Sequence, residues 1–391
     1  MTHCARRVLV PAALTAFAAA LLLVGGCASN DKVDPPAELV KLKATVRVEK
    51  AWSLSVGGAK PALRLGLGVA VADNRVFVAG HKGDVLAVSL DNGKTLWRTR
   101  TKLSLSGGPG VGEGLVVAGA GHGDLVALDA ATGAIRWKTR VNSEILSAPA
   151  IGAGLVVLRT VDGRLHALQA SDGKLVWAVE QQVPRLSLRG AAVPVIAGDA
   201  AMSGYDNGRV LAVSLKDGAT LWETTVAPPS GRTELERLVD IDSALHVVDD
   251  DVYVVSFQGR AVRLARDSGQ LWWAKDLSSF RGMTVDADGL YVSTSDGQVV
   301  KIARQTGVEV WRQDMLRNRN LSAPVLLGEQ VAVSDYKGYV HFFDRGTGAL
   351  TERLSGGGKV VSNAPAAAGD LALFMNDKGQ LSAYRLAKSR R

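Results

Sequence analysis

Cysteine is nearly absent from this chain of 391 residues, and its two copies, Cys4 and Cys27, both lie within the first 27 residues. The rest of the sequence therefore has no disulfide, no thiol nucleophile and no cysteine ligand for a metal. Proline is scarce, with 12 copies, and aromatic residues make up only 5% of the chain. In contrast, 43 glycines and 47% hydrophobic residues, without long blocks of Glu, Lys and Ala, favour a well-packed all-β fold with many turns.

A strong excess of one charge is also missing. The formal net charge is +8, and cleavage of a leader that carries Arg6 and Arg7 would leave 44 basic and 38 acidic residues, or +6. The basic residues are dispersed along the chain and are not clustered with aromatic residues. This distribution argues against a nucleic-acid-binding face.

The first 26 residues predict a secretory signal peptide. A pair of arginines precedes an apolar run over 8–24, and two small glycines precede Cys27. A permanent membrane-spanning helix is the weaker alternative, because the run is short and contains Pro11.

The motif Val24-Gly25-Gly26-Cys27 resembles the lipobox of bacterial lipoproteins, in which the cysteine is lipidated on sulfur and becomes the new amino terminus. The resemblance implies that several acyl chains on Cys27 anchor the protein to a bilayer. Because Ala28 and not Asp follows the cysteine, it also implies the periplasmic face of the outer membrane. An ordinary secretory signal with an incidental cysteine is the alternative. Residues 27–43 mix charges and prolines without periodicity, which predicts a flexible tether behind the lipidated cysteine.

One phrase recurs seven times in the remainder of the chain. The copies are GDVLAVSLDNGKTLW (83–97), GDLVALDAATGAIRW (123–137), GRLHALQASDGKLVW (163–177), GRVLAVSLKDGATLW (208–222), GRAVRLARDSGQLWW (259–273), GQVVKIARQTGVEVW (297–311) and GYVHFFDRGTGALTE (338–352). In each copy a glycine after Asn, Asp, Ser or Thr lies four residues before the last position, a pair that favours a tight hairpin turn. Each copy therefore predicts two antiparallel strands, and apolar segments upstream add two more.

The spacing of the repeat predicts the number of units. From Trp52 the spacings of the tryptophan position are 45, 40, 40, 45, 51 and 38 residues, and Glu352 takes the next position 41 residues later. Four-stranded units at this spacing are typical of a β-propeller. The last unit ends at residue 386 without a fourth strand, and the strand with Trp52 has no hairpin before it. We therefore predict one domain over 44–391, an eight-bladed β-propeller of four-stranded antiparallel blades whose ring is closed by the N-terminal strand.

The phrase ALDxxTGxxxW resembles the tryptophan-docking repeat of the eight-bladed quinoprotein dehydrogenases. The resemblance implies that the repeated indoles pack between blades and have a structural role; they are Trp52, Trp97, Trp137, Trp177, Trp222, Trp273 and Trp311. The quinoprotein family carries a vicinal disulfide against its cofactor, for which this sequence has no cysteines. The five histidines after the leader are scattered and form no closely spaced pair. We therefore expect no catalytic residues, no metal and no cofactor.

Two consecutive connections between units differ from the short connections elsewhere. They are VPRLSLRG (183–190) and GRTELERLVDID (231–242), and strand counting places them on the same face of neighbouring blades. Exposed leucines rimmed by charges predict a protein-binding patch. In the alternative, the leucines fold back as a local core and the charges pair with each other.

Taken together, the lipobox, the repeat and the segments PRLSLRG and ERLVDID resemble the BamB family of outer-membrane assembly lipoproteins over essentially the whole chain. The resemblance implies a non-catalytic scaffold of the β-barrel assembly (BAM) complex that docks on the periplasmic domains of BamA through these two segments. The candidate partner-binding residues that it implies are Leu186, Leu188, Arg189, Asp240 and Asp242. It also implies contact with other BAM subunits and with unfolded outer-membrane protein clients. The alternatives are a periplasmic quinoprotein-like oxidoreductase and another envelope-anchored binding propeller.

Overall fold

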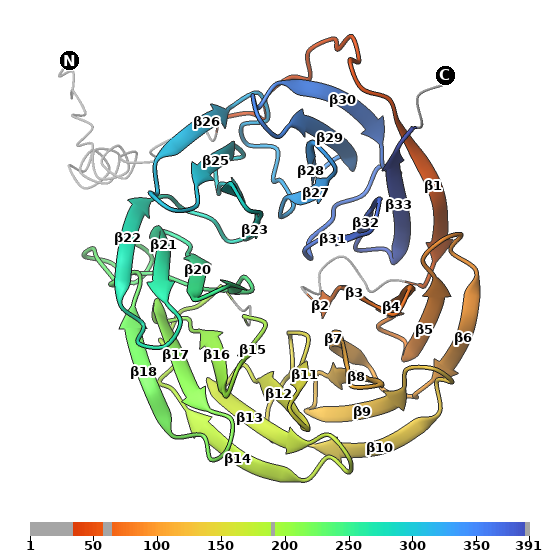
Figure 1. The fold of residues 1–391 in the computed structure, drawn as a ribbon, viewed down its shortest axis with the longest axis vertical. Coiled ribbons are helices and arrows are strands. Elements are labelled where there is room, and N and C mark those ends of the chain that lie inside the picture. Colours follow the sequence, from red (N-terminus) through yellow and green to blue (C-terminus); the bar gives the residue numbers. More distant parts are fainter. Residues whose placement is uncertain (1–33, 58–64, 189–191, 388–391) are drawn as a thin grey trace, which may run out of the picture. The chain divides into compact units, whose positions relative to one another are not determined.

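Eight sheets, whose four main strands are antiparallel, follow one another around a ring in the computed structural model (Figure 1). The structure describes residues 34–57, 65–188 and 192–387, so the predicted signal peptide, Cys27 and Arg189 lie outside the described residues. The ring belongs to the unit that begins at Pro36. In the described part of the chain, no helix is long and apolar enough to cross a membrane.

Each blade has four main strands, which follow one another from the inside of the ring outward. Blades one to four are β3 (Val69–Ala72), β4 (Arg75–Ala79), β5 (Asp84–Ser89) and β6 (Thr95–Arg100); β7 (Leu105–Gly112), β8 (Leu115–Ala120), β9 (Asp124–Asp129) and β10 (Ile135–Arg140); β11 (Ala150–Gly152), β12 (Leu155–Arg159), β13 (Arg164–Gln169) and β14 (Leu175–Glu180); and β15 (Val195–Ala197), β16 (Ala200–Gly204), β17 (Arg209–Ser214) and β18 (Thr220–Thr225).

The other four blades repeat the same order. They are β19 (His246–Val248), β20 (Asp251–Val255), β21 (Arg260–Ala265) and β22 (Leu271–Asp276); β23 (Met283–Val285), β24 (Gly289–Ser293), β25 (Val299–Ala303) and β26 (Glu309–Gln313); β27 (Val325–Leu327), β28 (Gln330–Ser334), β29 (Tyr339–Asp344) and β30 (Leu350–Ser355); and β31 (Ala366–Ala368), β32 (Leu371–Met375), β33 (Gln380–Leu386) and β1 (Val48–Ser55).

The N-terminal strand closes the ring, as the sequence predicts. Strand β1 pairs antiparallel with β33, with Val48 opposite Leu386 and Ser55 opposite Gln380. Strand β1 is thereby the outer strand of the last blade, and it gives blade eight its fourth strand. The predicted all-β, eight-bladed propeller is confirmed.

The repeated tryptophans join consecutive blades. Each indole N–H donates to a backbone carbonyl in the next blade, with N···O distances of 2.8 to 3.1 Å; the pairs are Trp52 and Leu90, Trp97 and Ala130, Trp137 and Ala170, Trp177 and Leu215, Trp222 and Arg266, Trp273 and Arg304, and Trp311 and Arg345. An aromatic ring that fills the gap while its N–H finds an acceptor combines apolar burial with a satisfied polar group. The junction of blades seven and eight has no such indole, and there Tyr384 packs against Phe342 and Phe374, with ring centroids 6.4 and 5.9 Å away.

The glycine of each hairpin turn has a second role that the repeat alone does not reveal. Gly133, in the β9–β10 turn, has a φ of 74°, as the predicted tight turn requires. A Cβ at Gly133 would also lie 2.5 Å from Trp97 of the preceding blade. The glycine therefore both makes the turn of its own blade and leaves room for the indole of its neighbour.

Blade two carries an additional strand that the sequence does not predict. Strand β2 (Gly66–Leu67) pairs parallel with β7 on the inner side of the sheet, with Gly66 opposite Gly107. A Cβ at Gly66 would lie 1.7 Å from the Leu146 carbonyl oxygen, and one at Gly110 would lie 1.9 Å from that of Pro149. The glycines of this region therefore permit backbone segments to approach each other more closely than side chains would allow.

The structure differs from the predicted flexible tether in the part of it that is described. The Ala37 N–H donates to the Arg317 carbonyl at 2.9 Å, and Leu39 packs against the apolar cluster between blades six and seven. The irregular pattern of residues 27–43 could not show this contact, because a single leucine and main-chain hydrogen bonds produce no periodicity. The chain is therefore fixed to the ring several residues before β1 begins.

Replacing Trp177 with alanine tests the docking of blade three on blade four. We expect Trp177→Ala to lower the free energy of unfolding by about 3–5 kcal/mol, because a buried indole and its bond to Leu215 are lost. Urea denaturation measures this change. The matched control is Leu175→Ser on the same strand, where the side chain is 59% exposed and a change within about 0.5 kcal/mol is expected. Equal effects of the two substitutions would contradict the docking role.

Candidate partner-docking site

The two unusual connections meet on one face of the ring. Residues 183–188 lead from β14 into β15, and residues 231–242 lead from β18 into β19. The Leu188 N–H donates to the Asp240 carboxylate at 3.1 Å, which joins the two connections directly. Leu186, Leu188, Asp240 and Asp242 thus lie in one region, while Arg189 falls outside the described residues.

The candidate residues differ in exposure. Leu186 is 41% exposed and Leu188 is half-buried, whereas Asp240 is only 1% exposed. In the second connection Leu235 is 66% exposed and Leu238 is buried. Each of the two alternatives for these segments therefore describes part of the site: some leucines project to solvent, and others fold back into a local core.

Local hydrogen bonds give the second connection a defined conformation. The Glu236 carboxylate accepts hydrogen bonds from the backbone N–H groups of Arg232 at 2.7 Å and Thr233 at 3.2 Å. The Thr233 hydroxyl in turn accepts from the Glu236 N–H at 3.1 Å, the reciprocal arrangement of a capping box. These backbone donors lower the pKa of Glu236. Further along, the Phe257 N–H donates to the Asp240 carbonyl at 2.7 Å, which fixes the end of the connection to blade five.

Charged residues from three blades lie beneath the site. Arg159, the last residue of β12, is fully buried; its guanidinium donates to the Asp206 carboxylate and lies 4.7 Å from the ring centroid of Tyr205. The carboxylates of Asp206, Asp240 and Asp242 lie within 4.8 Å of one another. Clustered carboxylates can ligate a hard cation, but here the guanidinium of Arg159 already supplies positive charge to the group.

Burial and like charge act together on Asp240. Desolvation raises the pKa of Asp240 well above that of an ordinary aspartate, and the neighbouring carboxylates of Asp242 and Asp206 raise it further. The bond from the Leu188 N–H and the charge of Arg159 oppose this shift without reversing it. Asp240 therefore retains its proton at neutral pH, which reduces repulsion within the cluster.

Arg159 and Asp206 belong to the site but are missing from the sequence prediction. Asp206 lies in the β16–β17 hairpin, and Arg159 lies in a strand of a different blade, so no local segment contains both. A signal was nevertheless present: at the strand position of Arg159, the other units have Ala79, Gly119, Gly204, Val255, Ser293, Ser334 and Met375. A single arginine at an otherwise small or apolar strand position indicates a buried ionic partner.

The shifted pKa of Asp240 predicts an unusual pH dependence. Between the unfolded value of about 3.9 and the raised folded value, the unfolded chain has lost this proton and the folded chain retains it, so stability falls as the pH rises. We expect Asp240→Asn to remove this pH-dependent contribution to stability. The free energy of unfolding of the variant, measured in urea from pH 5 to 8, should therefore decline less with pH than that of the parent protein. The control is Asp276→Asn, at a side chain that is 96% exposed. Parallel curves for Asp240→Asn and the parent would contradict the protonated state.

Comparison with known proteins gives the family of the chain. The family model described as outer membrane protein assembly factor BamB matches residues 45–102 and 81–313. The outer membrane protein assembly factor BamB of Pseudomonas aeruginosa is 44% identical over 376 residues, which cover 96% of this chain and 98% of the relative.

Solved structures agree with this result. The crystal structure of BamB from Moraxella catarrhalis is 27% identical, with a TM-score of 0.79 and coverage of 87% of this chain and 100% of that chain. A quinohemoprotein alcohol dehydrogenase from Comamonas testosteroni has a TM-score of 0.67 at 13% identity, with coverage of 88% and 77%, and shares the fold. The chain belongs to the BamB family.

Proposed function

We propose that the chain is an accessory lipoprotein of the machine that assembles outer-membrane β-barrels, and that it docks on the periplasmic domains of BamA. The observation that carries this proposal is the contact between Leu188 and Asp240, which joins the two unusual connections into one surface. The name of the P. aeruginosa relative, an outer membrane protein assembly factor, supports the same role.

The structure of the surface is suited to docking. Leu186 is exposed on a connection whose neighbour is held by the capping box of Glu236 and by the Asp240–Phe257 backbone bond. Apolar contacts on segments that are already ordered lose little conformational entropy when a partner binds. Arg159 and Asp206 are buried beside Asp240 and are therefore not placed to contact the partner themselves.

The proposed role is that of a scaffold without catalysis. The buried guanidinium of Arg159 is paired with the Asp206 carboxylate, and the Glu236 carboxylate accepts hydrogen bonds from its own connection, so these charged groups have a structural role. The similarity to the quinohemoprotein alcohol dehydrogenase is one of fold alone. On this proposal the propeller holds BamA in contact with other BAM subunits and assists unfolded outer-membrane proteins on their way to insertion.

A lipid anchor completes the proposal. Lipidation of Cys27 would hold the propeller at the periplasmic face of the outer membrane, where the BAM complex is assembled. Attachment through several acyl chains is stable, whereas a single chain gives only reversible binding. The anchor would therefore keep the propeller close to BamA even when the docking contact opens.

The docking site is tested by Leu186→Asp. We expect this charge to weaken binding to the purified periplasmic domains of BamA by at least about tenfold, since central apolar anchors each contribute more than about 1 kcal/mol. Isothermal titration calorimetry measures the affinity. Leu221→Asp is the matched control, because Leu221 is 50% exposed on outer strand β18, away from the site. Unchanged affinity of Leu186→Asp with a native thermal melt would refute the site.

The anchor is tested by Cys27→Ala. We expect this variant to appear in the soluble periplasmic fraction, because the acyl chains have no sulfur to attach to. Cell fractionation followed by mass spectrometry of the mature amino terminus makes the measurement. Membrane association equal to that of the parent, or an unmodified Cys27 in the parent, would contradict lipidation.

A further inference from the structure

Blade seven has an outer strand unlike those of the other blades. It has Glu352 at the position that tryptophan occupies elsewhere, and in β30 only the last of six residues is exposed. In β14, by comparison, four of six residues are exposed. The segment that covers β30 is residues 36–45, which we call the strap.

The strap follows blade seven from one face of the ring to the other. At its start the Ala37 N–H donates to the Arg317 carbonyl at 2.9 Å, and at its end the Thr45 N–H donates to the Thr351 carbonyl at 3.0 Å. Between these points Leu39 packs against the cluster that contains Trp311. The strap thereby covers the seam between blades six and seven.

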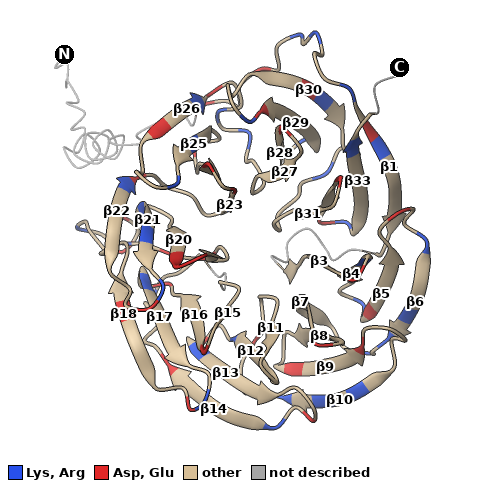
Figure 2. Ribbon diagram, in the orientation of Figure 1, with Lys and Arg blue, Asp and Glu red and all other residues tan. Residues whose placement is uncertain are grey.

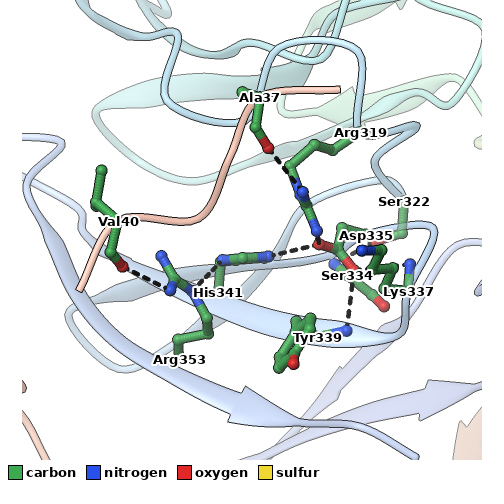
Figure 3. A network of polar contacts seen from close by, with 10 residues as sticks. All are labelled: Ala37, Val40, Arg319, Ser322, Ser334, Asp335, Lys337, Tyr339, His341 and Arg353. Atoms are coloured by element: carbon green, nitrogen blue, oxygen red, sulfur yellow. Dashed lines mark hydrogen bonds and ion pairs between the residues drawn. The ribbon is translucent and has the colours of Figure 1, made fainter. Parts of the chain in front are cut away.

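Two arginines hold the strap through its main chain. Arg319 Nη1 donates to the Ala37 carbonyl at 2.7 Å, and Arg353 Nη1 donates to the Val40 carbonyl at 2.9 Å (Figure 3). Because these acceptors are backbone atoms, the contacts depend on the path of the strap and not on its side chains.

A buried histidine and aspartate orient the two arginines. Arg319 donates to Asp335 Oδ2 through Nε at 2.8 Å and Nη2 at 2.6 Å, and His341 Nε2 lies 3.1 Å from the same oxygen (Figure 3). Arg353 Nε donates to His341 Nδ1 at 3.3 Å. Since Nδ1 accepts this bond, the imidazole proton is on Nε2 and is donated to Asp335. Burial lowers the pKa of His341, which favours this neutral form. Asp335 and His341 thus orient the two guanidinium groups, and the Nη1 atom of each group donates to the strap.

The start of the strap lies on the face that carries the candidate docking site. Arg317 and Arg319 belong to the connection from β26 to β27, which is equivalent to the connections 183–188 and 231–242. In a ring of antiparallel blades, all connections from an outer strand to the next inner strand emerge on one face. The chain therefore reaches blade seven on the docking face, crosses the outer edge of the blade and enters β1.

We propose that Arg319 and Arg353 form a clamp that fixes the exit point of the membrane anchor at blade seven, on the docking face. The consequence for orientation rests on the proposed lipidation of Cys27. Nine Cα-to-Cα steps separate Cys27 from Pro36, and at about 3.3–3.6 Å each they span at most roughly 30 Å. The docking face is therefore the face turned toward the membrane.

The clamp is tested by a nitroxide label at Glu38→Cys in the full mature lipoprotein. Glu38 is exposed in the strap, and lipidation of Cys27 with loss of Cys4 leaves the introduced thiol alone. We expect a motionally restricted electron paramagnetic resonance spectrum. Arg353→Ala should increase the mobile component several-fold, and Arg136→Ala, which removes an arginine from blade two, should not change it. More than one label per chain would show an unmodified Cys27 and would contradict lipidation without affecting the clamp.

A second variant keeps this test decisive. Arg319→Ala removes the partner of a buried carboxylate and can prevent folding, so Leu39→Ser, which changes the strap and not the ring, is used beside Arg353→Ala. Both should release the label while the thermal melt of the ring stays cooperative. A label that is already mobile in the parent, or one that Arg353→Ala does not release, would overturn the clamp.

The orientation is tested on vesicles of phosphatidylethanolamine and phosphatidylglycerol that contain a headgroup quencher. Fluorophores are placed separately at Lys337→Cys, in the β28–β29 turn on the docking face, and at Glu329→Cys, in the β27–β28 turn on the opposite face. We expect stronger quenching at 337 than at 329, and a smaller difference when Arg353→Ala is added. Equal quenching at the two positions, or stronger quenching at 329, would overturn the assigned orientation. Failure of the lipoprotein to bind vesicles would instead contradict the lipidation.

Discussion

The ring depends on one interaction, which occurs at seven of its eight junctions: the indole of one blade packs over a glycine turn of the next. Trp177 shows the pattern: its ring lies 3.0 Å from the position that a Cβ at Gly218 would take, and its N–H donates to the Leu215 carbonyl. Because every blade is held by its neighbours, the ring must close to be complete, and β1 closes it. At the junction of blades six and seven the strap covers the seam, and the junction of blades seven and eight, which has no indole, is filled by other aromatic rings.

A rigid ring allows residues from separate blades to build one site. Arg159 of blade three, Asp206 of blade four and Asp240 of the connection to blade five meet beneath Leu188, although no two of them are close in the sequence. Burying Asp240 beside two other carboxylates costs stability, and this cost is consistent with a local structure maintained for docking. Charges elsewhere are interspersed around the ring, as Figure 2 shows, and some of them form pairs, such as Arg98 with Asp84.

The sequence predicts the features that repeat and misses those that occur once. The spacing from Trp52 to Glu352 and the glycine turns were sufficient for the number of blades and for ring closure. Strand β2 was not predictable, because two residues produce no periodic pattern, and the strap was not, because Arg319 and Arg353 hold it by backbone atoms. At the site, the connections containing Leu186 and Asp240 stood out as interruptions of the repeat. Arg159 and Asp206 did not, since their partnership exists only in the folded ring.

The central claim is that the repeat builds the scaffold while the interrupted connections carry the function. Site-specific photocrosslinking in intact cells tests it most directly, with a photoreactive residue at position 186 on the docking face or at position 221 on the outer strand of blade four. The account predicts a crosslinked product with BamA from position 186 and none from position 221. A BamA product from position 221 alone, with the protein folded and at the membrane, would contradict it.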